Sequence, residues 1–226
     1  MQDDRAQVLA AIRASLPHAH LPMARATLPP RRKSGQGDPA QLVNDFVREL
    51  EAVGGVGHIA RDDEAAIEIV MELLNESEGR ELLAWDDADL GVRGLGEALR
   101  AGGYTRLMID LPHEPEARRA HLLELERASA GITGASAGLA DTGSLALVTS
   151  ASRPRLASLL PPTHIALVHT SQLYPDMSSF LNARADLFHD ASNLVLVTGP
   201  SRTADIELTL TRGVHGPKFL HVILLA

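Results

Sequence analysis

The stretch GGVGHIARDDEAAIEIVMELLNESEGRELLAW, residues 54–85, contains the alternation that decides the fold. Two short apolar segments, 56–60 and 81–85, have the length and composition of buried strands. Between them, apolar residues recur at helical spacing, which predicts a helix over 63–75. A strand, a helix and a second strand in this order are typical of a parallel sheet covered by helices.

The same alternation continues on both sides of this stretch. Asp38 followed by Pro39 is a typical helix start, and Gly54 ends the helix that follows. The other expected strands are 105–110, 144–149, 164–169, 193–198 and 220–225, and the other expected helices are 94–101, 114–128, 153–160, 178–188 and 203–211. Residues 38–226 are therefore predicted to form one α/β domain with a mostly parallel sheet flanked by helices.

The first 37 residues have a different pattern. Residues 4–15 are predicted to form a short helix, and residues 17–37 are rich in Pro, Gly and basic residues, which is typical of a mobile linker. The chain begins with acidic Asp3 and Asp4, unlike the basic and then apolar start of a secretory signal peptide. No apolar run approaches the ~20 residues of a membrane-spanning helix, so we expect a cytoplasmic protein.

Composition excludes several classes of chemistry. The chain has no cysteine, so it has no disulfide, thiolate nucleophile or cysteine-ligated iron–sulfur cluster. A net charge of −8 and only seven aromatic residues argue against nucleic-acid binding. Residues 41–130 are strongly acidic, whereas residues 131–226 carry six basic and six acidic groups. This neutral third, rich in Gly, Ser and Thr, is where we expect the functional residues.

Two glycine turns in this third surround a short stretch of small residues. They are Gly131–Gly134 and the Asp141-Thr142-Gly143-Ser144 turn. Glycines allow a ligand or another backbone to approach closely. Beside hydroxyl groups, the Asp141 carboxylate is a candidate nucleophile, base or ligand anchor. The alternative is a tight turn in which Asp141 bonds only to its neighbours in sequence.

A second candidate segment runs from Gly199 to Glu207. The pattern predicts a strand, a turn of small residues and then a helix, whose first N–H groups would bind a phosphate or carboxylate together with Ser201, Arg202 and Thr203. In the alternative, a hydroxyl simply caps the helix and Arg202 pairs with Asp205. There is no Gly-Lys-Ser/Thr sequence, which argues against an ATPase.

The histidines do not form a metal-binding pattern. His164 and His169 lie on opposite faces of one expected strand, and His215 and His221 lack the helical spacing of a metal pair. We expect no metal site, and interpret these histidines as structural residues or as donors at the rim of a pocket. Neither the serine-hydrolase motif G-x-S-x-G nor the dinucleotide-binding motif G-x-G-x-x-G occurs where it would be needed.

Five ordered motifs resemble the LUD-domain family, in particular its lactate-utilisation protein C type. The resemblance is dense over 131–226 and looser over about 40–130. The motifs are Gly131-Ile132-Thr133-Gly134, Asp141-Thr142-Gly143, Leu159-Leu160-Pro161-Pro162-Thr163-His164-Ile165-Ala166, Gly199-Pro200-Ser201-Arg202-Thr203-Ala204-Asp205-Ile206-Glu207 and Gly213-Val214-His215-Gly216-Pro217.

The resemblance implies a fold similar to the isomerase/CoA-transferase-like class, which includes ribose-5-phosphate isomerase. It also implies a part in the oxidation of L-lactate to pyruvate beside iron–sulfur partner proteins. With no cysteine in this chain, the clusters are expected on the partners, and the chain itself is expected to be non-redox with no cofactor of its own.

The resemblance further implies a pocket between the 131–144 loops and the 199–207 segment for a small carboxylate or phosphate-bearing ligand. The family turn usually reads Glu-Thr-Gly-Thr, and Asp141 is one methylene shorter than that Glu, which displaces its carboxylate by about 1–1.5 Å. Asp141 is the catalytic candidate, and the candidate anion-binding residues are Thr133, Gly134, Thr142, Gly143, Gly199, Ser201, Arg202, Thr203, Asp205 and His215.

Two other functions are open at this point. One is a free-standing enzyme that acts on a phosphorylated sugar, a CoA ester or a folate and uses Asp141 as base or nucleophile. The other is a regulatory or scaffold subunit that binds no ligand.

Overall fold

The computed structural model describes residues 2–15, 38–77, 79–189, 191–203, 211–212 and 215–226. The chain divides into two units, Met1–Lys33 and Ser34–Ala226. In the first unit, α1 (Gln2–Ser15) matches the helix expected over 4–15, and its apolar side chains Val8 and Ile12 are exposed. The linker expected over 17–37 lies outside the described residues.

The second unit is built on a six-stranded sheet in which every pairing is parallel. From one edge to the other, its strands are β1 (Val56–Ala60), β12 (Phe219–Leu225), β7 (Thr163–His169), β4 (Ala130–Gly134), β2 (Glu81–Ala84) and β3 (Thr105–Arg106). Four strands were expected close to these positions, and the prediction of a mostly parallel α/β sheet is confirmed. The expected strand 105–110 is shorter in the structure, where only Thr105 and Arg106 pair with β2.

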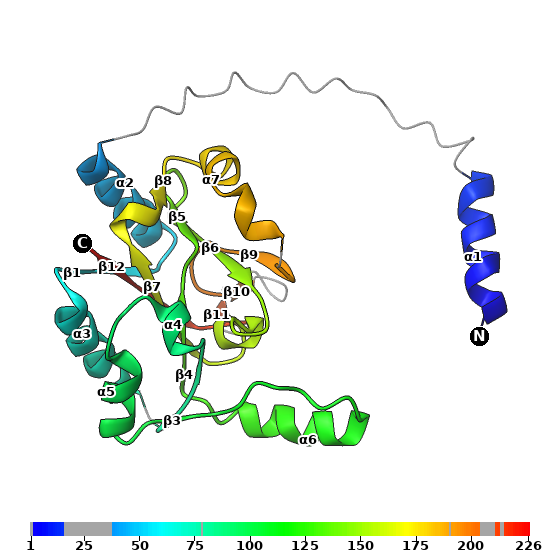
Figure 1. Cartoon of the computed structure of the whole chain (residues 1–226), viewed down its shortest axis with the longest axis horizontal. Helices are drawn as coiled ribbons and strands as arrows, with labels where there is room; N and C mark the ends of the chain where they lie inside the picture. Colours follow the sequence, from blue (N-terminus) through cyan, green and yellow to red (C-terminus); the bar gives the residue numbers. More distant parts are fainter. Residues whose placement is uncertain (1, 16–37, 78, 190, 204–210, 213–214) are drawn as a thin grey trace. The chain divides into compact units, whose positions relative to one another are not determined.

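Helices flank this sheet (Figure 1). They are α2 (Pro39–Ala52), α3 (Asp63–Asn75), α4 (Asp87–Leu90), α5 (Leu95–Ala101) and α6 (Pro115–Leu125), whereas α7 (Met177–Ala183) packs against a second, smaller sheet. As predicted, α2 begins with Pro39 in its first turn, after Asp38, whose side chain accepts a hydrogen bond from the N–H of Ala40. Asp62 caps α3 in the same way, and α3 lies beside α5.

A second sheet of four strands was not expected from the sequence. Its order is β8 (Leu173–Tyr174), β5 (Ala137–Leu139), β6 (Ser144–Thr149) and β9 (Asn193–Val197). β5 and β6 form an antiparallel hairpin, and Asp141 lies in its turn. The large core includes Phe46 and Leu50 of α2, whereas Phe180 belongs to a smaller cluster beside the second sheet.

The segment 131–134, expected to be a loop, is a central strand in which every residue is buried. Its glycines serve close packing: a Cβ on Gly131 would overlap the carbonyl oxygen of Ala157, and one on Gly134 would overlap that of Asp89. The loop prediction was wrong because glycines that allow close approach to a ligand look the same in sequence as glycines that allow close approach to backbone.

The prediction of a helix over 203–211 is wrong at both ends of this range, where the structure has strands. β10 (Arg202–Thr203) pairs antiparallel with β11 (Thr211–Arg212), and residues 204–210, including Asp205, lie outside the described residues. The helix expected over 153–160 is a 3-10 turn, η2 (Arg155–Ser158). The helix expected over 178–188 is divided into α7 and η4 (Ala185–Phe188), and η3 (Thr170–Gln172) follows β7. None of the helices that the structure describes is long and apolar enough to cross a membrane.

Candidate functional site

The parallel sheet has a natural ligand position between β2 and β4. These two strands are neighbours, but the chain leaves them in opposite directions. After β2 it forms β3 at the adjacent edge of the sheet, and after β4 the next strand that it adds to this sheet is β7, on the side away from β2. Open α/β sheets bind ligands beyond the carboxyl ends of strands at such a reversal. The residues that follow Ala84 and Gly134 are therefore the first place to look for a site.

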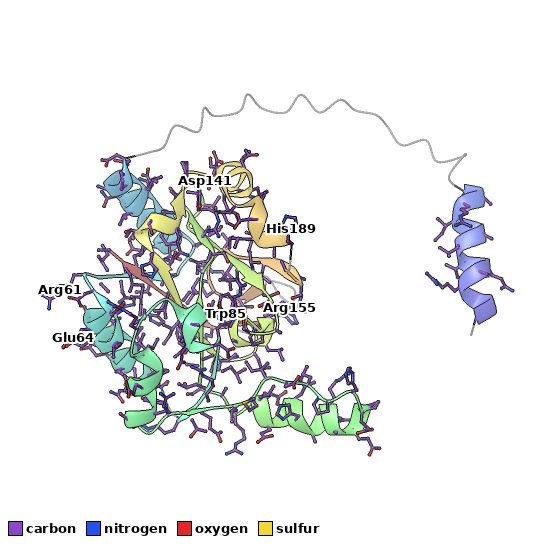
Figure 2. The ribbon with its side chains drawn as sticks, in the orientation of Figure 1. Arg61, Glu64, Trp85, Asp141, Arg155 and His189 are labelled. Carbon is purple, nitrogen blue, oxygen red and sulfur yellow. The ribbon has the colours of Figure 1, made fainter. Side chains whose placement is uncertain are left out.

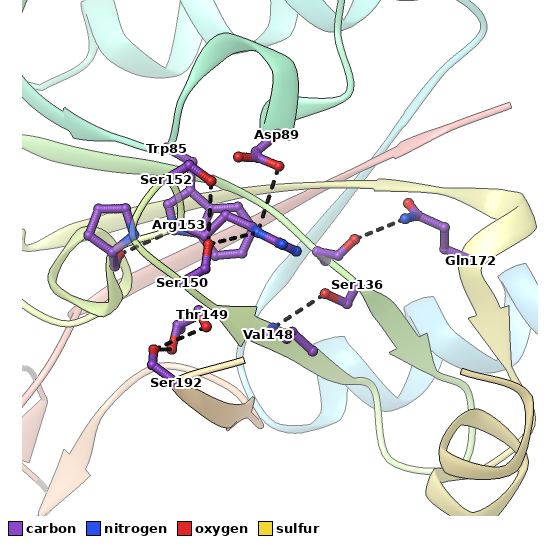
Figure 3. A network of polar contacts seen from close by, with 12 residues as sticks. Trp85, Asp89, Ser136, Val148, Thr149, Ser150, Ser152, Arg153, Gln172 and Ser192 are labelled. Atoms are coloured by element: carbon purple, nitrogen blue, oxygen red, sulfur yellow. Dashed lines mark hydrogen bonds and ion pairs between the residues drawn. The ribbon is translucent and has the colours of Figure 1, made fainter. Parts of the chain in front are cut away.

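Polar side chains gather at this position (Figure 3). We call them the carboxyl-edge cluster, which consists of Trp85, Asp89, Ser136, Ser150, Ser152 and Arg153. The indole N–H of Trp85 donates to the carbonyl of Pro154 (3.2 Å), and the N–H of Asp86 donates to the carbonyl of Ser152 (3.2 Å). These bonds join the end of β2 to the loop after β6.

Arg153 is the cation of this cluster, and its side chain is only 28% exposed. Its Nε lies 3.3 Å from Oγ of Ser150 and 3.6 Å from Oδ1 of Asp89. No residue of the described chain forms a hydrogen bond with its two terminal nitrogens. The outer edge of the guanidinium is therefore available to bind a carboxylate through two parallel hydrogen bonds.

The neighbouring strand ends are held rigidly. The Gln172 side chain donates to the carbonyl of Ala135 (3.0 Å) and accepts from the N–H of His169 (2.9 Å). Nε2 of His169 donates to the carbonyl of Gly91 (2.9 Å), which follows α4. The ends of β7 and β4 and the loop after α4 are thus connected, and such fixed surroundings favour a preorganised site.

Thr133, a predicted anion-binding residue, is fully buried in β4. Its Oγ1 lies 2.9 Å from Nε2 of His164 on β7, which is also fully buried. Within the described chain, Nδ1 of His164 has no hydrogen-bond partner. Burial lowers the pKa of His164 to about 4, because the charged imidazolium would lose its hydration. The pair therefore belongs to the interior of the sheet.

The predicted turns around Gly143 and Gly199 lie together, beside the segment that precedes β1. Oγ of Ser144 lies 2.6 Å from Oγ1 of Thr198, and a Cβ on Gly199 would lie 2.9 Å from the carbonyl oxygen of Val53. Arg202, which follows, donates from Nη2 to the same carbonyl (2.6 Å). The structure thus brings the 142–144 turn to the 198–202 turn.

It does not bring Thr133 or Gly134 to these turns. Both belong to β4, and Gly134 ends that strand under α4, whereas the N–H of Ser201 donates to the carbonyl of Pro217 just before β12 begins. The predicted residues therefore lie at two ends of the parallel sheet. Among the other candidates, His215 is exposed and Thr203 lies in β10.

Asp141 is exposed at the hairpin turn. Its N–H donates to the carbonyl of Pro175 (3.1 Å), and its Oδ1 accepts from the hydroxyl of Thr142 (3.3 Å). Figure 2 shows Asp141 well apart from Trp85 of the carboxyl-edge cluster. These local bonds match the alternative in which Asp141 stabilises a turn, and its role as a catalytic group stays a prediction.

The chain does not offer the ligands that an iron–sulfur cluster needs. It has no cysteine thiolate. In the described ranges, no three His, Asp or Glu side chains are placed to hold a metal ion.

Sequence reasoning did not find the carboxyl-edge cluster. A signal was present, because Trp85 ends one expected strand and Asp86 follows it, and Ser150-Ala151-Ser152-Arg153 directly follows another. Whether two strand ends are neighbours depends on strand order, which the sequence pattern does not reveal.

The pKa of His164 predicts an acid-sensitive fold. The unfolded chain binds this proton near pH 6.5 and the folded chain only near pH 4, so the stabilisation is complete above pH 6.5 and is lost as the pH falls toward 4. Between pH 7.5 and 5.5, wild type should lose about 1.3 kcal/mol of unfolding free energy through this group. His164→Gln should lose correspondingly less over the same interval, as measured by urea unfolding.

Burial also lowers the pKa of His58 and of His221. These residues therefore add to the slope of unfolding free energy against pH in wild type and in His164→Gln alike, and do not contribute to the difference in slope between the two proteins. His113→Gln, at an exposed position, is the control and should keep the wild-type slope. Equal slopes for wild type and His164→Gln would contradict the prediction.

Comparison with known proteins shows which family this chain resembles. The family model described as LUD domain matches residues 43–225. An uncharacterized protein of Neisseria meningitidis is 41% identical over 95 residues, which are 42% of this chain and 41% of that protein. Lactate utilization protein C of Macrococcus caseolyticus is 34% identical over 158 residues, 66% of this chain and 63% of that protein. The chain thus spans between two fifths and two thirds of the length of these relatives.

The crystal structure of a DUF162 family protein from Deinococcus radiodurans has a similar fold. The TM-score is 0.60 at 20% sequence identity, and the match covers 84% of this chain and 99% of that one. A solved structure thus has a similar overall fold. Since the family model covers most of the chain, the protein belongs to the LUD domain family.

Proposed function

We propose that this protein is a component of L-lactate utilisation, which acts in the cytoplasm with iron–sulfur partner proteins in the oxidation of L-lactate to pyruvate. The observation that carries the proposal is the similarity to relatives named lactate utilization protein C. The absence of cysteine supports a division of labour in which the partners hold the redox groups and this chain holds none.

In this proposal, the carboxyl-edge cluster binds a small anionic ligand of the lactate or pyruvate type. Each of these ligands has one carboxylate and one adjacent oxygen. The free edge of the Arg153 guanidinium suits the carboxylate, and the hydroxyl groups of Ser150 and Ser152, which lie 3.3 Å apart, suit the second oxygen. Asp89 lies on the Nε side of Arg153 and orients the guanidinium.

The anion site predicted around Ser201 and Arg202 remains a second position for the same class of ligand. There the Arg202 side chain is already bonded to the carbonyl of Val53, and the expected helix start is missing at Thr203. The carboxyl-edge cluster is therefore the better supported position. The alternative of a free-standing enzyme has less support, because Asp141 is exposed and bonded within its own turn.

The proposal is tested by recovering the tagged full chain from its source cells grown on L-lactate. We expect iron–sulfur proteins to co-purify, detected by iron and sulfide content, and the recovered complex to reduce a dye when L-lactate is added. Recovery of the chain without iron–sulfur proteins, or a complex that does not respond to L-lactate, would contradict the proposal.

A further inference from the structure

A hollow of about 410 Å³ lies between α5 and the β2–β3 edge of the parallel sheet. Its position follows the rule for open sheets, because Ala84 and Arg106 are the last residues of β2 and β3. The volume lies within the usual range for small-molecule sites. The residues that line it include Leu82, Ala84, Leu99, Arg100, Tyr104 and Arg106.

One wall of this hollow is apolar and fixed. Leu82, Leu99 and Tyr104 are each at most 5% exposed, so their positions are set by the core. The hydroxyl of Tyr104 donates to Oδ1 of Asn75 (3.1 Å), and the guanidinium of Arg80 lies 4.7 Å from the centre of its ring. This wall suits the hydrocarbon part of a ligand.

The opposite wall is cationic. Arg106 and Arg100 both face the carboxylate of Asp87: Arg106 is hydrogen-bonded to Oδ1, and Nη1 of Arg100 lies 3.8 Å from Oδ2. Gly96 makes room for Asp87, since a Cβ at this position would lie 2.5 Å from the carboxyl carbon. The two guanidinium groups that face Asp87 and this one carboxylate together carry one positive charge, which a singly charged anion balances.

We propose that this hollow binds a monocarboxylate with an apolar body, with Arg106 as the main donor and Arg100 as the second. The site is separate from the carboxyl-edge cluster. Asp87 of α4 contacts the arginines of the hollow, whereas Asp89 of the same short helix contacts Arg153. The Arg106 side chain is 31% exposed, so its interaction with a carboxylate is partly protected from solvent.

The test is calorimetric titration of the full chain with benzoate, acetate and inorganic phosphate. We expect benzoate to bind at least about tenfold more tightly than acetate, because the apolar wall contacts only a ligand with an apolar body. We also expect it to bind more tightly than phosphate. Binding of phosphate or acetate as tight as that of benzoate would overturn the proposal, as would the absence of benzoate binding.

Single substitutions test which residues of the chain bind benzoate. Arg106→Gln should weaken benzoate binding at least about tenfold, and Asp87→Asn should strengthen it, because it removes the competing carboxylate. Arg119→Gln, an exposed position on α6, should bind as wild type does. Equal affinities for Arg106→Gln and Arg119→Gln would overturn the assignment.

If Arg106→Gln does not fold, Arg100→Gln gives the same test at a side chain that is 69% exposed, with a smaller expected loss. Arg153→Gln removes the carboxylate donor of the carboxyl-edge cluster, so the benzoate binding that remains in this variant belongs to the hollow. In the Arg153→Gln background, Arg106→Gln should still weaken benzoate binding at least about tenfold, which separates the hollow from the ligand site of the proposed function.

Discussion

Gly131→Ala is expected to lower the unfolding free energy by at least about 3 kcal/mol. A Cβ on Gly131 would overlap the carbonyl oxygen of Ala157 and lie 2.9 Å from its carbonyl carbon. Both are backbone atoms of η2, which packs against β4. A rotamer change cannot relieve the overlap, so η2 and the central strand must move apart. Urea unfolding of wild type and variant measures the loss.

Gly57→Ala is the matched control for this substitution. Gly57 is also a strand glycine, but the atoms nearest to its added Cβ are side-chain atoms of Val47 and Leu50, at 3.3 Å or more. We expect Gly57→Ala to change the unfolding free energy by no more than about 1 kcal/mol. Similar losses for the two variants would show that close packing of η2 on β4 is not what Gly131 provides.

Gly143→Ala is expected to have the second largest effect, again at least about 3 kcal/mol. Gly143 has φ +62°, and its Cβ would overlap the backbone nitrogen of Leu50 and lie 2.6 Å from the carbonyl carbon of Glu49. The substitution combines an unfavourable backbone conformation with a clash against α2. Amide hydrogen exchange should show faster opening in the last turns of α2.

Gly103→Ala separates these two contributions. Gly103 has a similar φ of +77°, but no atom lies within 4 Å of an added Cβ. Gly103→Ala should therefore lower the unfolding free energy only through the unfavourable backbone conformation, by about 1 kcal/mol. If Gly143→Ala lowers the unfolding free energy no more than Gly103→Ala does, the contact between the hairpin turn and α2 does not stabilise the fold.

These glycines also show how far the sequence predicts the structure. Strands such as 56–60 and helices such as 63–75 follow from local periodicity, and the structure confirms them at the expected residues. Gly131 and Gly134 were predicted to lie in a loop, because glycines allow a ligand or another backbone to approach closely. They lie in a buried central strand, because backbone from η2 and α4 fills the space above them.

The candidate site could be predicted only in part, for a similar reason. Arg153 and Trp85 are 68 positions apart in the numbering, and they belong to one cluster only because β2 and β4 are neighbours and the loop after β6 folds back to the end of β2. Strand order is a property of the whole chain. The resemblance in 131–226 led to the correct family, whereas motif residues such as Thr133 and Asp141 lie in different parts of the fold.

The central claim is that this chain supports L-lactate oxidation and binds its anion through Arg153. The most direct measurement is the rate of L-lactate-dependent dye reduction by the iron–sulfur complex recovered with wild type, Arg153→Gln or Arg93→Gln. Arg93 is an exposed arginine bonded to Asp63 of α3, and its variant should match wild type. We predict that Arg153→Gln lowers the rate at subsaturating L-lactate at least about tenfold. A rate for Arg153→Gln equal to that of Arg93→Gln, or full activity in a complex without this chain, would contradict the account.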